Sequence, residues 1–180
     1  MSSKLMKFSN FFKGLNAAEI GHSDNTYLSH ASSVYRDLKS WKCSEELCDA
    51  GMFHSIYGTE IFQKFALPLE RRGDVQKLIG TRAEHLAYLN CCLVRSSFDE
   101  SLKIPLDKYT LEDRFLQQEV EVPQKDYNDL CLIHLCDWLE QVGRVQLWNL
   151  RRDAFRRIAT RLGGIALKSY DRVFSQAPVD

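Results

Sequence analysis

The chain has 180 residues, of which 44% are hydrophobic and 27% are charged, and its 24 basic residues balance its 24 acidic ones. This composition is typical of one globular domain with a sizeable core. Zero net charge excludes a general electrostatic attraction to nucleic acids or membrane surfaces. Because no apolar run approaches the roughly 20 residues of a membrane span and no signal-peptide pattern is present, we predict a cytoplasmic protein.

Helical periodicity dominates the chain, and no strict apolar–polar alternation of useful length predicts a strand. We therefore expect an all-α fold, with a single helical domain over residues 1–180. The predicted helices span residues 4–15, 26–41, 45–56, 59–66, 74–97, 111–118, 126–143 and 147–174. The irregular segment 98–110 could form a lid or carry a short hairpin.

Two neighbouring helices each place one histidine on an apolar face. His30 lies on the apolar stripe of helix 26–41, and His54 ends the inward stripe of helix 45–56. The short connection predicts that these helices pack antiparallel, so the two histidines should face each other. Imidazole is the commonest biological metal ligand, and the pair therefore predicts a shared metal site. The alternative is a pair of hydrogen-bonded core histidines.

The segment TYLSHASSVYRDLKSWKCSEELCDAGMFHSIYGTE, residues 26–60, resembles the opening of the HD-domain superfamily. That superfamily is all-helical and is named for a His-Asp dyad that binds divalent metals. The resemblance matches His30 to the first histidine, His54 to the dyad histidine and Asp137 to a distal aspartate. Ser55 stands where the dyad has its aspartate.

The motif HSIYGT at this position is typical of a little-studied family of HD-like domains. Three further segments carry the same resemblance, namely AAEIGHS at 17–23, IGTRAEHLAYL at 79–89 and LWNLRRDAFRRIA at 147–159. The resemblance implies an HD-like helical bundle. The superfamily consists mostly of phosphohydrolases, with a smaller group of iron-dependent oxygenases, so it implies chemistry of one of these kinds.

Ser55 changes what the resemblance implies for the metal. Serine is a poor metal ligand, so a four-ligand or binuclear site is not expected. His30, His54 and Asp137 would remain as two histidines and one carboxylate, a set that suits iron or zinc better than manganese. Asp137 lies off the strongest apolar stripe of its helix, so a surface aspartate stays an alternative. His134, three residues earlier, is a fallback ligand.

Five further residues are candidates for the catalytic site. Ser55 and Tyr57 could line the open side of the metal, where Tyr57 could donate a proton; alternatively they only cap and pack the turn. Arg82 could bind a substrate carboxylate or phosphate, and the alternative is a buried pair of Arg82 with Glu84. His22 could enter the site from a helix N-terminus.

The expected function is a metal-dependent hydrolase or non-haem iron oxygenase that acts on a small anionic substrate. The alternatives are an HD-like ligand-binding or protein-interaction module without metal, and a metal-free enzyme with His30 or His54 as general base. We expect no nucleic-acid or membrane partner and keep a homodimer open. The basic run 151–161 is interpreted as a solvated helix face, with phosphate binding or partner docking as the alternative. The six cysteines form no CxxC pair and are predicted to be free, buried thiols.

Overall fold

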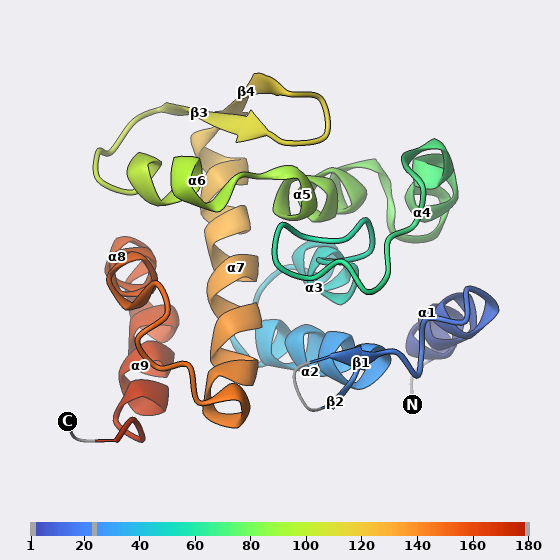
Figure 1. The fold of residues 1–180 in the computed structure, drawn as a ribbon, viewed down its shortest axis with the longest axis horizontal. Helices are drawn as coiled ribbons and strands as arrows, with labels where there is room; N and C mark the ends of the chain where they lie inside the picture. Colours follow the sequence, from blue (N-terminus) through green and yellow to red (C-terminus); the bar gives the residue numbers. More distant parts are fainter. Residues whose placement is uncertain (1–2, 23–24, 179–180) are drawn as a thin grey trace.

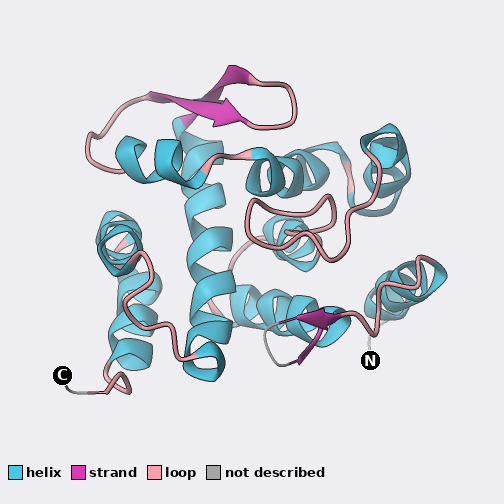
Figure 2. Cartoon of the chain, viewed as in Figure 1, coloured by secondary structure: helices cyan, strands magenta, loops and turns pink. Residues whose placement is uncertain are grey.

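The computed structural model describes residues 3–22 and 25–178, without the side chains of His22 and Asn25, and this part of the chain is mostly helical (Figure 1; Figure 2). Its helices are α1 (Ser3–Gly14), α2 (Tyr27–Ser40), α3 (Glu45–Met52), the 3-10 turn η1 (Leu69–Arg71), α4 (Arg72–Ile79), α5 (Thr81–Cys92), α6 (Arg95–Ser101), α7 (Gln124–Val145), α8 (Arg152–Leu162) and α9 (Gly164–Phe174). Two antiparallel pairs add the strands β1 (Gly21–His22) with β2 (Asn25–Thr26), and β3 (Lys108–Asp113) with β4 (Gln118–Pro123). The expected all-α fold is thus confirmed as mainly helical, whereas the two strand pairs depart from it.

Helix α7 is the central element of the molecule. Figure 1 shows it as a long upright rod, with α8 and α9 on one side and α2, α3 and α5 on the other. Because neighbours surround it, α7 is buried on most of its sides rather than along one stripe. Leu132 and Leu139 are half-buried, whereas Ile133 and Trp138 are buried. A one-stripe interpretation therefore could not place Asp137.

Helices α2 and α3 form the predicted pair, and a side-chain hydroxyl caps the N-terminus of each. The hydroxyl of Thr26 accepts the backbone N–H of Ser29, and the hydroxyl of Ser44 accepts that of Leu47, both at 3.2 Å. The two helices approach closely at Gly51, where an added Cβ would lie 2.3 Å from Cδ1 of Leu38. This close contact brings the end of α3 against the face of α2 that carries His30.

The segment after α3 is not helical, which corrects two expectations. The helix predicted to reach residue 56 ends at Met52, and the helix predicted over 59–66 is a loop. Gly58 takes a left-handed conformation, φ 72°, inside this loop. Phe53 and Ile56 are fully buried, so tertiary packing holds the segment without helical hydrogen bonds.

Glycines and left-handed residues divide two other predicted helices. The segment 74–97 is broken at Gly80, φ 89°, and the segment 147–174 at Gly163 and Gly164, φ 62° and 49°. Helix α8 starts only at residue 152, because Arg151 itself is left-handed, φ 49°. The glycine pair therefore separates α8 from α9.

The predicted helix 111–118 is wrong, because this segment belongs to the β3–β4 hairpin. Strand β3 alternates exposed and buried residues, with Tyr109, Leu111 and Asp113 inward. Its register pairs Lys108 with Pro123 and Asp113 with Gln118. Residues 108–110, at the end of the segment considered as a lid or hairpin, begin β3.

No helix within the described residues is long and apolar enough to cross a membrane. All six cysteines are free thiols, and five of them are buried. Cys43 alone is partly exposed, so the prediction of free thiols is confirmed and that of complete burial is wrong at this one position.

Candidate metal centre

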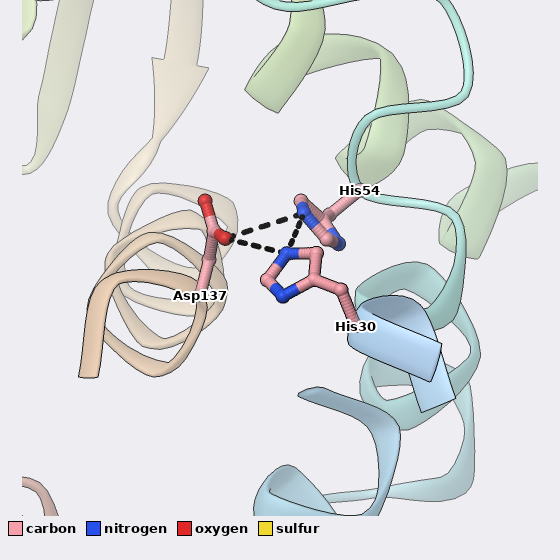
Figure 3. A group of neighbouring side chains, drawn as sticks. All are labelled: His30, His54 and Asp137. Atoms are coloured by element: carbon pink, nitrogen blue, oxygen red, sulfur yellow. Dashed lines mark hydrogen bonds and ion pairs between the residues drawn. The ribbon is translucent and has the colours of Figure 1, made fainter. Parts of the chain in front are cut away.

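Three segments bring His30, His54 and Asp137 together. His30 lies on α2, His54 lies in the turn after α3, and Asp137 lies on α7, and their side chains point toward one another (Figure 3). Nε2 of His30 lies 3.2 Å from Nε2 of His54 and 3.0 Å from Oδ1 of Asp137. Nε2 of His54 lies 3.4 Å from the same oxygen. Both histidines are fully buried, and the Asp137 side chain is 14% exposed.

The hydrogen bonds on the opposite side of each ring fix which nitrogen carries the proton. Nδ1 of His30 lies 2.5 Å from Oε2 of Glu140, and Nδ1 of His54 lies 2.7 Å from the carbonyl oxygen of Gly51. An ionised carboxylate and a carbonyl only accept hydrogen bonds, so each Nδ1–H must donate. When both rings are neutral, each therefore turns an Nε2 lone pair toward Asp137, as metal-binding histidines do.

The charges of this cluster require a positive partner. Two lone pairs and a carboxylate oxygen repel one another unless a proton or a metal ion lies between them. Burial lowers the pKa of His30, but hydrogen bonds to Asp137 and Glu140 outweigh it and raise this pKa to about 9. Burial likewise acts to raise the pKa of Asp137, but the two histidines hold it well below its usual range.

The three atoms fit one metal ion. Adjacent ligands with bonds of about 2.1 Å lie about 3.0 Å apart at right angles and about 3.4 Å apart at the tetrahedral angle. The observed separations of 3.0, 3.2 and 3.4 Å span this range. Among the described residues these three form the group able to hold an ion. Two imidazoles and one carboxylate suit iron or zinc and leave coordination positions open.

Without metal, we expect stability to fall as the pH rises from 6 to 10. The pKa of His30 is about 9 in the folded protein against 6.5 unfolded. Its stabilisation, about 3 kcal/mol, is thus complete below pH 6.5 and is lost as the pH rises through 9. Urea unfolding of chelator-treated protein measures this loss. His30→Gln should flatten the pH dependence, and an unchanged dependence in this variant would assign it to other groups.

A cavity of about 280 Å³ adjoins the cluster, and His54, Ser55 and Asp137 form part of its wall. The remaining wall is largely apolar and aromatic, with Phe62, Trp138, Val145, Leu147, Leu150 and Phe155. Its cationic residues are Lys64, Arg95 and Arg151. Two of the three candidate ligands therefore face a space that can hold a small molecule.

The structure places Tyr57 and Glu84 outside the residues that line this cavity. The Tyr57 hydroxyl donates to Oε1 of Glu84 at 2.8 Å, and Nε of Arg72 donates to the same oxygen at 2.7 Å. Nε2 of Gln76 donates to the other oxygen. Glu84 thus joins α4, α5 and the turn after α3, and this network places both Tyr57 and Glu84 away from the cavity.

Arg82 also lies away from the cavity and does not pair with Glu84. Its guanidinium binds Glu46 at 2.8 Å and both Asp126 and Asp129 at 2.5 Å, which ties α5 to α3 and α7. Residues two apart on a helix point to different sides, which separates Arg82 from Glu84. Three carboxylates surround this guanidinium, an arrangement that favours an interhelical ion-pair network over the predicted binding of a substrate anion.

Ser55 lines the cavity as expected, and its hydroxyl donates to the Tyr27 hydroxyl at 3.2 Å. His134 lines it too, but both of its nitrogens are engaged. Nη1 of Arg151 donates to Nε2 at 2.9 Å, so Nδ1 donates to Oδ1 of Asn90 at 3.3 Å. His134 is therefore not a ligand in this cluster. The side chain of His22 lies outside the described residues.

Two residues of the site were missed in the sequence. Glu140 orients His30, and its signal was the i, i+3 spacing from Asp137, which puts both carboxylates on one helix face. Arg95 lines the cavity, and its signal was a single cation directly after the apolar run CCLV. Neither signal identifies a site from the sequence alone, because each residue acquires its role only through contacts with other helices of the fold.

The family model described as "Domain of unknown function (DUF6817)" matches residues 11–95. This span contains His30, His54, Ser55 and Arg95, and it ends before α7 and therefore before Asp137. No curated protein and no solved structure matches the chain.

Proposed function

We propose that this protein is a metal-dependent enzyme with an HD-like helical scaffold, in which His30, His54 and Asp137 bind one iron or zinc ion. The observation that carries the proposal is the orientation of the two histidine rings. Glu140 and the Gly51 carbonyl hold the two Nδ1 protons, so both Nε2 atoms face one carboxylate oxygen. The resemblance to HD domains supports it, because the matched residues come together.

The ion would supply Lewis acidity and, if it is iron, redox chemistry. The chain's own residues keep the ligands oriented and provide the substrate space. Glu140 fixes the ring of His30, and Arg144 fixes Glu140 through hydrogen bonds of 2.7 and 2.8 Å. The stacked rings of Trp138 and Phe155 exclude water from one wall. Ser55 offers a hydroxyl where an HD dyad would add a carboxylate.

Hydrolysis and oxidation both remain within this proposal, since three protein ligands with open positions serve zinc hydrolases and non-haem iron enzymes alike. A second candidate is a metal-free binding module on the same scaffold. It is favoured by His30, because a protonated His30 ring donates hydrogen bonds to both Asp137 and Glu140 and so balances their negative charge without a metal ion. Metal content separates the two functions.

The test is elemental analysis of protein purified without chelator, in air and anaerobically. We expect about one iron or zinc per chain in the parent and almost none in His54→Ala. The matched control is His85→Ala, because His85 is a half-buried histidine of α5 outside the cluster. Iron would direct the search to oxidations and zinc to hydrolysis. A parent protein without metal, and without a thermal shift on adding iron or zinc, contradicts the proposal.

A further inference from the structure

Arg95 is a buried cation in the cavity wall. It is the first residue of α6, and only 8% of it is exposed to solvent. Burial, together with the nearby charge of Arg151, lowers its pKa to about 10, so it stays cationic at neutral pH. Taking a charge out of water is costly unless an opposite charge compensates it.

The described residues compensate this charge only in part, through the carboxylates of Asp137 and of Glu60, which accepts the backbone N–H of Arg95. No carboxylate oxygen among them lies within 4.0 Å of the guanidinium, and its one side-chain hydrogen bond, from Nη1 to the Asn90 carbonyl, is 3.5 Å long. Its Nε atom has no partner there. Arg151 in the same wall differs, because it is bound through both Nε and Nη2 to Asp99. Arg95 is therefore the cation of the inner wall that can accept an anionic ligand.

Much of the remaining cavity lining is apolar. The rings of Trp138 and Phe155 stack with centroids 5.2 Å apart and planes at 6°. Ile61, Leu147 and Leu150 also line the cavity and are 68%, 52% and 40% exposed, so aliphatic side chains form its rim. The indole Nε1 of Trp138 is a second buried donor without a partner among the described residues. Exposed aliphatic groups around a hollow are typical of a binding site.

We propose that this cavity binds a small amphipathic oxyanion, with its carboxylate or phosphate head paired to Arg95 and its apolar body against Trp138, Phe155 and the leucine rim. Any reaction of this ligand rests on the proposed function, whereas its binding requires only Arg95 and the apolar wall. Because His54 and Asp137 line the same cavity, the bound head lies in the space that the metal ligands face. Its volume of about 280 Å³ limits the ligand to a small molecule.

Calorimetric titration with defined probes tests the proposal. The probes are octanoate and octyl phosphate as amphipathic anions, 1-octanol as the neutral analogue, and acetate and inorganic phosphate as anions without a body. We expect octanoate or octyl phosphate to bind at least tenfold more tightly than all three controls, and the tighter one identifies the head group. Binding of neither amphiphile, or equal binding of 1-octanol, overturns the proposal.

Arg95→Met isolates the charge, because methionine keeps an unbranched side chain in the same space. We expect the amphiphile's affinity to fall at least thirtyfold, 1-octanol binding to stay unchanged, and thermal stability to stay equal or rise, since a buried charge without a direct ion pair is removed. The matched control is Arg157→Met, which removes the same charge from an exposed position of α8 outside the cavity. Parent-like binding by Arg95→Met overturns the proposal.

Two further measurements test the proposal if Arg95→Met does not fold or if the protein binds no metal. If Arg95→Met does not fold, the exposed double variant Leu147→Ser with Leu150→Ser should weaken amphiphile binding at least fivefold, and unchanged binding overturns the proposal. Titrations are repeated on chelator-treated protein and on His54→Ala. Binding that persists there supports the subsite even if the metal proposal fails. One ion per chain without amphiphile binding overturns the subsite and leaves the metal centre standing.

Discussion

Replacing Asp137 with asparagine is expected to weaken metal binding at least a hundredfold while the chain stays folded. The amide has nearly the shape of the carboxylate, but it carries no charge and is a poor ligand for iron or zinc. Asp137 also supplies the one oxygen that both histidines contact, at 3.0 and 3.4 Å. Competition with a chromophoric chelator measures the change in affinity.

A graded series makes this prediction specific. Glu140→Gln keeps all three ligands and alters only the acceptor of the His30 Nδ1 proton, so a smaller loss of about 10- to 100-fold is expected. Asp171→Asn is the control, because Asp171 forms an exposed ion pair with Arg156 outside the cavity. If all three variants bind metal equally well, Asp137 is not a ligand.

Replacing Glu84 with alanine is expected to lower the free energy of unfolding by about 3 to 5 kcal/mol. Glu84 is fully buried and accepts hydrogen bonds from Arg72, Gln76 and Tyr57. Its removal leaves the Tyr57 hydroxyl buried without its acceptor and the Arg72 guanidinium without its counter-ion. Urea denaturation measures the loss.

The matched control is Glu46→Ala, which removes one exposed carboxylate from Arg82 and should cost less than about 1 kcal/mol. Metal content of a still-folded Glu84→Ala sample should be unchanged, because Glu84 lies outside the metal cluster. A loss of metal without a loss of stability would instead return Glu84 to the catalytic site.

The parts of the fold that local chemistry determines were predictable. Thr26 and Ser44 begin α2 and α3 as their capping chemistry requires, and the helical periodicity of both segments is correct. The errors arose where tertiary contacts decide the structure. The loop at 59–66 is closed by hydrogen bonds between Thr59 and Phe62 rather than by a helical ladder, and in the β3–β4 hairpin only β3 alternates exposed and buried residues, over six positions.

The candidate site likewise contains residues that the sequence could place and residues that it could not. His30 and His54 could be placed together because two adjacent helices share a short connection. Asp137 was assigned from the resemblance to HD domains. The apolar stripe of its helix did not predict its burial, because α7 is buried on most of its sides rather than along one stripe. The limit of sequence-based prediction is clearest for Arg82 and Arg95. Both are cations beside apolar helix faces, and only the positions of Asp126 and Asp129 show that the first is neutralised.

Helix α7 contributes three things from one continuous rod: the ligand Asp137, the orienting carboxylate Glu140, and the cavity wall at Trp138. Inserting or deleting one residue upstream within this rod would rotate its two parts by about 100° relative to each other. Either the hairpin end or the site would then lose its neighbours. Changes in chain length should therefore be tolerated in the exposed β3–β4 turn and at the α8–α9 junction, whereas α7 should evolve by substitution alone.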